Sequence, residues 1–157
     1  MKPVVLKLAT VLVSSAVALG VGEAVARRTY GEGFTILVDP YEDHSYRPFV
    51  QYEQAWGDRT IRLYTNSLGW KDSRPGRVVE EKSGLPRIVF LGDSFTEGLG
   101  CIQEDTVSGV VERELNKQGP RVEVLNGGRS SYSPLLEYQR LRKFFAAGYE
   151  ADVVVLL

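Results

Sequence analysis

The longest apolar stretch of the chain lies at its N-terminus, and it predicts a membrane helix. Between Pro3 and Gly22 the only charged residue is Lys7. A helix of this length rises about 30 Å, which matches the hydrocarbon thickness of a bilayer. Lys7 stands near one end, where its aliphatic stem can carry the ammonium to the headgroups. The pattern predicts a signal anchor over residues 1–26, with residues 3–22 in contact with the lipid bilayer.

Two other interpretations of this segment stay open. The small residues Ala24-Val25-Ala26 are typical of a signal-peptidase site, although Glu23 directly precedes them, and cleavage there would make the protein secreted. The third interpretation is a buried helix of a soluble protein. Basic residues flank the span on both sides, so charge does not fix its orientation.

Residues 27–84 lack a sustained period and are expected to form an irregular, aromatic-rich connector. Prolines at positions 40, 48 and 75 interrupt it. Thr60–Tyr64 alternates polar and apolar residues like a short half-buried strand, and Asn66–Gly69 is typical of a turn. The connector's aromatic residues are expected to pack at the domain edge or the membrane interface, and the alternative is a carbohydrate-stacking surface; they are Tyr41, Tyr46, Phe49, Tyr52, Trp56, Tyr64 and Trp70.

Residues 85–157 alternate continuous apolar runs with amphipathic segments. The apolar runs suit strands that are covered on both faces, and apolar positions three or four apart predict helices between them. In order, the expected elements are a strand at Arg87–Leu91, a loop from Gly92 to Gly100, a helix capped by Asp105 and carrying Val107 to Leu115, a strand at Val122–Leu125, a helix opening at Ser133-Pro134, and a buried strand at Ala151–Leu157.

This alternation predicts an α/β fold, a three-layer arrangement with a doubly wound parallel sheet. Ligands of such sheets bind outside the carboxyl ends of the strands, so the loops that begin at Gly92 and Asn126 form the candidate site. A charged carboxyl group directly after the apolar run that reaches Leu157 would be costly to bury. We therefore expect residues 85–157 to be the first part of a larger domain, with an incomplete sheet.

Charge and cysteine content narrow the class of function. The formal net charge is −1, from 19 basic and 20 acidic residues, so no basic surplus favours nucleic acid as a partner. Cys101 is the only cysteine, which excludes an intramolecular disulfide, and it is expected to be a small packing residue.

The sharpest chemical signal is the heptapeptide from Gly92 to Gly98, Gly-Asp-Ser-Phe-Thr-Glu-Gly, directly after the first apolar run. A serine on a tight turn there points out of the carboxyl edge of the sheet, and nearby backbone N–H groups can face an oxyanion. The nucleophile elbow of the α/β-hydrolases would need glycine where Thr96 stands. Walker and dinucleotide loops would need further glycines that the heptapeptide lacks.

Gly92-Asp93-Ser94 followed by Gly98 resembles the first sequence block of the SGNH (GDSL-like) hydrolases. Leu125–Ser133 resembles their second block, and Thr65–Asp72 is similar to a segment that precedes the first block in membrane-anchored bacterial members. The resemblance covers residues 60–157, and its specificity comes from the combination of the three segments. It implies the flavodoxin-like fold of that family, with no cofactor and no metal.

The resemblance also implies roles for individual residues. Ser94 matches the nucleophile, and its own N–H would be one oxyanion donor. The second-block glycine that supplies the next N–H aligns with Ser131, which leaves open whether Gly128 or Ser131 donates. Asp93 and Asn126 would support the two loops. The family's third donor, an asparagine after the third strand, and its general-base histidine in an Asp-x-x-His motif would lie beyond Leu157.

His44 is the only histidine, and it is expected to be an ordinary surface residue because Tyr41, not aspartate, stands three positions before it. Without a general base, serine is a poor nucleophile at neutral pH, and Asp93 is expected to fix its loop and not to act as the base. Residues 1–157 are therefore expected to be inactive as they stand.

For the complete protein, the expectation is a serine esterase that hydrolyses carboxylic esters, in particular acetyl esters, through an acyl-enzyme. Its substrate would be an ester-bearing small molecule or a cell-surface glycan. The domain would be held at the cell membrane by a single-pass helix and would face the extracytoplasmic side. Two alternatives stay open: an O-acyltransferase acting on extracellular polysaccharide, and a non-catalytic membrane-bound scaffold.

Overall fold

The computed structural model describes residues 2–30 and 35–157, and these form two separate compact units. The first contains the helix α1 (Lys2–Tyr30). The segment Pro3–Arg28 of α1 has a mean hydropathy of 2.2, and none of it is buried by other parts of the protein. The predicted N-terminal helix is therefore present, and it is long and apolar enough to span a membrane. Met1 and residues 31–34, which fall in the predicted anchor and connector, lie outside the described residues.

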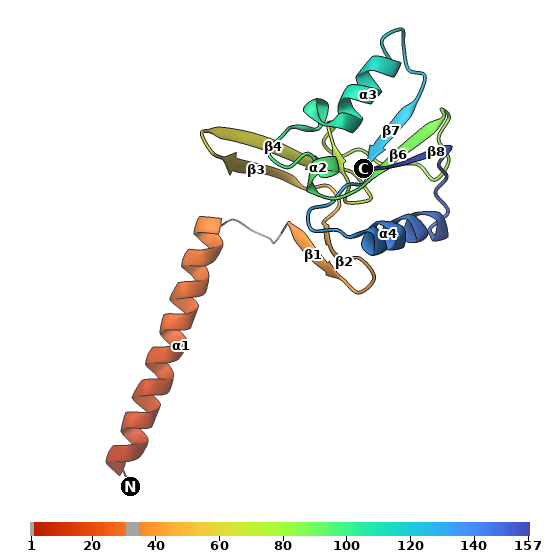
Figure 1. Cartoon of the computed structure of the whole chain (residues 1–157). Helices are drawn as coiled ribbons and strands as arrows, with labels where there is room; N and C mark the ends of the chain where they lie inside the picture. The colour runs from red at the N-terminus through yellow and green to blue at the C-terminus, as the bar shows by residue number, and fades with distance from the viewer. Residues whose placement is uncertain (1, 31–34) are drawn as a thin grey trace. The chain divides into compact units, whose positions relative to one another are not determined.

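The second unit, residues 35–157, is a mixed α/β domain (Figure 1). Its helices are α2 (Ser94–Glu97), α3 (Val107–Leu115) and α4 (Pro134–Ala146), with a 3₁₀ turn at Gln103–Asp105. Its strands are β1 (Ile36–Asp39), β2 (Asp43–Tyr46), β3 (Gln51–Trp56), β4 (Arg59–Thr65), β5 (Lys71–Asp72), β6 (Arg87–Leu91), β7 (Glu123–Asn126) and β8 (Val153–Leu156).

The main sheet has six strands in the order β3-β4-β5-β7-β6-β8. Strands β7, β6 and β8 run parallel, as the strand–helix alternation predicts. The expectation of an all-parallel sheet is wrong, because β3, β4 and β5 extend it in antiparallel fashion from β7. The short strands β1 and β2 pair with each other in a separate two-stranded sheet.

The predicted irregular connector over residues 27–84 is also wrong. Its first residues continue α1, and residues 36–72 carry the five strands β1 to β5. The β3–β4 pair closes at Gly57-Asp58, between the partners Trp56 and Arg59. Gly57 has a φ of 62°, which glycine adopts without steric cost, and a Gly-Asp pair is a hairpin turn signal. The half-buried strand expected at Thr60–Tyr64 is confirmed as part of β4.

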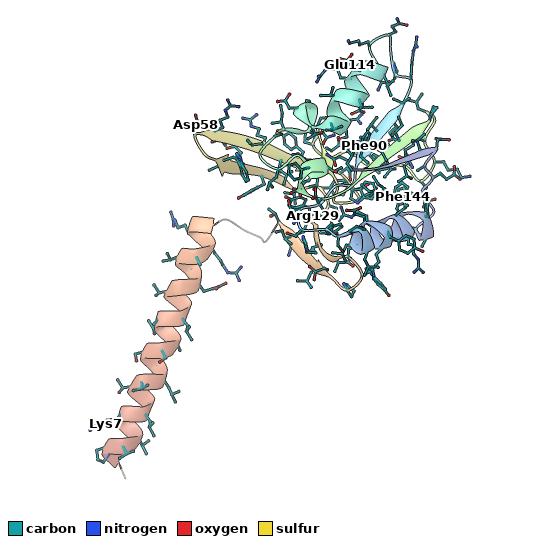
Figure 2. The ribbon with its side chains drawn as sticks, in the orientation of Figure 1. Lys7, Asp58, Phe90, Glu114, Arg129 and Phe144 are labelled. Atoms are coloured by element: carbon teal, nitrogen blue, oxygen red, sulfur yellow. The ribbon has the colours of Figure 1, made fainter. Side chains whose placement is uncertain are left out.

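Helices α3 and α4 lie on opposite sides of the β7-β6-β8 layer (Figure 1). On the α4 side, Val89 and Leu91 of β6 pack with Leu125, Trp70 and Phe144, and the Trp70 and Phe144 rings stack at 5.2 Å. Phe90 points to the other face, because side chains alternate along a strand. Both Phe90 and Phe144 are labelled in Figure 2. The packing places the carboxyl ends of β6 and β7 side by side.

Two local predictions need correction. The N-cap of α3 is Thr106, whose hydroxyl accepts from the Gly109 N–H at 3.1 Å, while Asp105 lies in the preceding 3₁₀ turn. The last strand, β8, is not buried: Val153 is 49% exposed and Leu156 is 65% exposed. Among the described residues β8 pairs only with β6, so it is an edge strand. The helix predicted at Ser133-Pro134 is confirmed as α4.

Candidate active site

Ser94 is the first residue of α2, immediately beyond the carboxyl end of β6. The Asp93 carboxylate accepts a hydrogen bond from the Phe95 N–H at 2.9 Å and so caps this helix. A side chain at Gly92 would place Cβ 2.6 Å from the Leu157 carbonyl oxygen and 2.0 Å from Thr96 Oγ1. Glycine is therefore required at this position for the chain to turn from the strand into α2.

The second-block loop lies directly against this turn. The Gly127 N–H donates to the Phe90 carbonyl at 2.7 Å, and the Arg129 N–H donates to the Gly92 carbonyl at 3.0 Å. A Cβ at Gly128 would lie 2.4 Å from the Glu97 nitrogen, which is backbone and cannot move aside. The absence of a side chain at Gly128 thus lets the two predicted blocks meet.

The structure distinguishes the two candidate oxyanion donors of this loop. The Gly128 N–H is already bonded, because it donates to Asn126 Oδ1 at 3.1 Å. The Ser131 N–H has no hydrogen-bond partner among the described residues, and neither does the N–H or the hydroxyl of Ser94. Ser131 has a φ of 68°, in the left-handed region. Of the two, Ser131 is the residue with a main-chain donor available to a ligand.

Glu97, the last residue of α2, joins the two loops through a buried carboxylate. It is 2% exposed, and it accepts from the Ser130 N–H at 2.5 Å and from the Ser130 hydroxyl at 2.7 Å. The Tyr46 hydroxyl donates to it at 2.7 Å. Its counter-charge is Arg129, labelled in Figure 2, whose guanidinium lies 3.5 Å away and stacks on the Tyr46 ring. Burial and the adjacent Glu97 charge raise the pKa of Tyr46. The sequence analysis did not identify Glu97 or Arg129.

The sequence analysis expected His44 to be an ordinary surface residue. Its side chain is in fact only 21% exposed, and it contacts the same loop from β2. Its Nε2 lies 2.8 Å from the Ser130 carbonyl oxygen, and its Nδ1 lies 2.8 Å from the Asp43 carboxylate. Its ring packs edge-on against Tyr132. The Tyr132 hydroxyl donates to the His44 carbonyl oxygen at 2.6 Å.

A second buried ion pair anchors the β1–β2 sheet to α4. Arg140 is 2% exposed and contacts the Glu42 carboxylate at 2.9 Å. The same guanidinium donates to the Gly127 carbonyl at 2.9 Å and to the Tyr132 hydroxyl at 2.8 Å. Strand β2, the second-block loop and α4 are therefore held as one unit around a single buried cation.

The segment Thr65–Asp72 supports the loop that follows Ser94. The Lys71 ammonium donates to the Gly98 carbonyl at 2.8 Å and to the Cys101 carbonyl at 2.6 Å. Burial lowers the pKa of Lys71. The buried Asn66 side chain fixes this segment, because its Oδ1 accepts from the N–H groups of Leu68 and Trp70. These contacts give a physical reason for the segment to accompany the Gly-Asp-Ser heptapeptide.

Chemically, the arrangement offers a serine hydroxyl and main-chain N–H groups that are free to bind a ligand, but no base paired with that hydroxyl. Among the described residues, no side chain hydrogen-bonds to the Ser94 hydroxyl, and no group of three His, Cys, Asp or Glu residues could hold a metal ion. Glu137 of α4 is a buried carboxyl group that the sequence analysis missed. Burial and the charge of Asp93 raise the pKa of Glu137.

The Phe95 side chain, next to Ser94, is 85% exposed and adds an apolar surface at the edge of the candidate site. The predicted carbohydrate-stacking alternative concerns another region: Tyr41 is 70% exposed and lines a cavity of about 330 Å³ with residues of α4.

Comparison with protein-family models finds no match for this sequence, and comparison with curated proteins finds none either.

Proposed function

We propose that the chain carries the nucleophile half of a serine esterase of the SGNH type. The observation that carries this proposal is the position of Ser94, at the carboxyl edge of the sheet, with an uncommitted hydroxyl and N–H. The second-block loop, with the uncommitted Ser131 N–H, packs against the same turn. Two main-chain donors beside a nucleophile are what acyl transfer requires, because charge develops on the carbonyl oxygen.

In the proposed reaction a general base takes the proton of the Ser94 hydroxyl as Oγ bonds to the ester carbonyl carbon. The carbonyl oxygen becomes an oxyanion that the N–H groups of Ser94 and Ser131 stabilise. Collapse of the tetrahedral intermediate breaks the bond to the alcohol, which leaves with the proton, and the acyl-enzyme remains. Water then releases the carboxylic acid. If a sugar hydroxyl takes the place of water, the same steps give an O-acyltransferase.

The base is the part of this mechanism that the described residues do not supply. The SGNH resemblance implies a histidine in an Asp-x-x-His motif, and no such motif occurs in residues 1–157. His44 contacts Asp43 and the Ser130 carbonyl. We therefore propose that a residue outside 1–157 acts as the base, and that the substrates are acetyl esters of small molecules or cell-surface glycans.

We further propose that α1 anchors the domain to the cell membrane, with the domain on the extracytoplasmic side. The support for anchoring is the length and hydropathy of Pro3–Arg28. The support for the side is chemical only, because surface glycan esters lie outside the cytoplasm.

Chemical rescue tests the esterase proposal on the chain as it stands. Residues 1–157 in detergent micelles should show no Ser94-dependent hydrolysis of a short-chain aryl ester, because the base is missing. Added imidazole should supply the base and restore turnover above the rate that imidazole gives with the Ser94→Ala variant. Removing triad members in serine enzymes leaves only residual catalysis, so the increment should be readily measured. Equal rates for the two proteins at every imidazole concentration would refute the esterase and favour a non-catalytic scaffold.

A further inference from the structure

The backbone around Ser131 is held in a conformation that serine does not prefer. Residues Arg129 to Tyr132 form a β-turn, in which the Tyr132 N–H donates to the Arg129 carbonyl at 3.1 Å. Ser131 is the third residue of the turn and has a φ of 68°. A positive φ at this position is typical of a type II turn, whereas a type I turn has a φ near −90° there.

The two turn types differ in the direction of the central peptide group, here the one that joins Ser130 to Ser131. In a trans peptide the C=O and the N–H point in opposite directions, so a flip of this group reverses the Ser131 N–H. Residues other than glycine disfavour positive φ because their Cβ crowds the backbone. Serine by itself therefore favours type I, in which the Ser131 N–H would point away from its present direction.

His44 holds the carbonyl end of this peptide group. A carbonyl oxygen can only accept, so His44 Nε2 donates to the Ser130 oxygen across 2.8 Å. The ring itself is fixed by Asp43 at Nδ1 and by the edge contact with Tyr132. On the other side of Ser130, its N–H and hydroxyl are bonded to Glu97. A flipped peptide would lose the His44 bond.

We propose that His44 is a positioning residue that locks the Ser130–Ser131 peptide, and thereby keeps the Ser131 N–H aimed for oxyanion stabilisation. The catalytic part of this inference rests on the proposed esterase function. The conformational part does not, because it concerns only the direction of one peptide group. His44 acts through the backbone, because its ring nitrogens bond to Asp43 and the Ser130 carbonyl.

The test compares His44→Phe in two backgrounds, using the full chain in micelles with saturating imidazole. Phenylalanine keeps the packing against Tyr132 but removes the Nε2 donor. In the Ser131 background, loss of this bond should lower kcat roughly tenfold and leave KM unchanged. Glycine adopts a positive φ readily, so in a Ser131→Gly background the same change should leave kcat unaltered. Val38→Ala is the matched control and should change nothing, because Val38 is the cross-strand neighbour of His44 and is 92% exposed.

Equal losses of kcat in both backgrounds would overturn the proposal, because they would show a general structural defect. No loss in either background would overturn it as well. If His44→Phe does not fold, the Ser131→Gly background provides the folded comparison, and a fall in kcat there refutes the lock.

A second readout separates this proposal from the esterase itself. NMR measures the backbone coupling and the Cα chemical shift of residue 131, and both report its φ. In His44→Phe they should indicate a negative φ, and when Ser131→Gly is added they should indicate a positive φ again. If no variant shows Ser94-dependent turnover, the proposed function fails while this measurement still decides the lock. A positive φ retained in His44→Phe would overturn it.

Discussion

Removal of the Glu97 charge is expected to destabilise the domain far more than removal of an exposed carboxylate. Glu97 and Arg129 are 2% and 3% exposed, so Glu97→Gln leaves a buried guanidinium without a counter-charge. Removing one partner of a buried ion pair costs roughly 3–5 kcal/mol. Ser130 also exchanges a charged acceptor for a neutral one, but this loss overlaps with the first and is not added to it.

The matched control is Glu53→Gln, which breaks the pair of Glu53 with Arg62. Those side chains are 62% and 68% exposed, so water and salt screen the pair and it contributes little to stability. Denaturant unfolding followed by tryptophan fluorescence is the suitable assay, because both tryptophans, Trp56 and Trp70, lie in residues 35–157 and none lies in α1. The free energy of unfolding should fall by several-fold more for Glu97→Gln than for Glu53→Gln.

Equal losses for the two variants would refute the argument that burial gives the Glu97 pair its importance. A further variant separates charge from packing. Adding Arg129→Met to Glu97→Gln removes the orphaned cation, so part of the lost stability should return. A double variant that is less stable than Glu97→Gln alone would show that packing of the arginine, and not its charge, dominates.

Three further predictions concern the loops and the helix α1. Gly128→Ala should abolish imidazole-rescued, Ser94-dependent turnover, because its Cβ would lie 2.4 Å from the Glu97 nitrogen, whereas Gly84→Ala, with no atom within 4 Å, should be neutral in the same assay. Burial lowers the pKa of Lys71 below 10.5, so the unfolded chain binds the proton more tightly than the folded one. The stability of wild type relative to Lys71→Met, measured in unfolding titrations, should therefore rise with pH up to about pH 10.5. Val13→Asp with Ala16→Lys should release the protein from membranes in a carbonate wash, because each charge costs about 2.5–3.5 kcal/mol at the centre of a span; retention in the pellet would contradict anchoring by α1.

The sequence predicts those elements of the fold that short, strongly apolar segments form. Strands β6 and β7 fall within a residue of their expected positions, because β6 contains the apolar run Ile88–Leu91, β7 contains the apolar pair Val124-Leu125, and turn residues follow both. The strands β1, β2, β3 and β5 were missed because they are short and partly exposed, so no apolar period marks them. Strand β5 has only two residues, and it exists through pairing with β4 and β7.

The residues of the candidate site also fall into those that the sequence predicts and those that it does not. The sequence brings Ser94 and the second-block loop together, because both follow neighbouring parallel strands. The choice between Gly128 and Ser131 stayed open, since it depends on where Asn126 Oδ1 points. Glu97, Lys71 and His44 were missed as supporting residues because their partners are distant in sequence. One signal was available: Glu97 and Arg129 are charged residues of opposite sign within two loops that are otherwise mostly small or polar.

The long sequence separation of the site's contacts also determines when it can form. His44 and Ser130 are 86 positions apart, and the Tyr132 hydroxyl bonds to the His44 carbonyl across 88. Contacts between distant residues must overcome the entropy of closing a long loop, and domains rich in them fold slowly. During synthesis, α1 emerges about a hundred residues before the second-block loop. The turn at Arg129–Tyr132 should therefore be among the last features to become native, after the helices and the β3–β4 hairpin have formed.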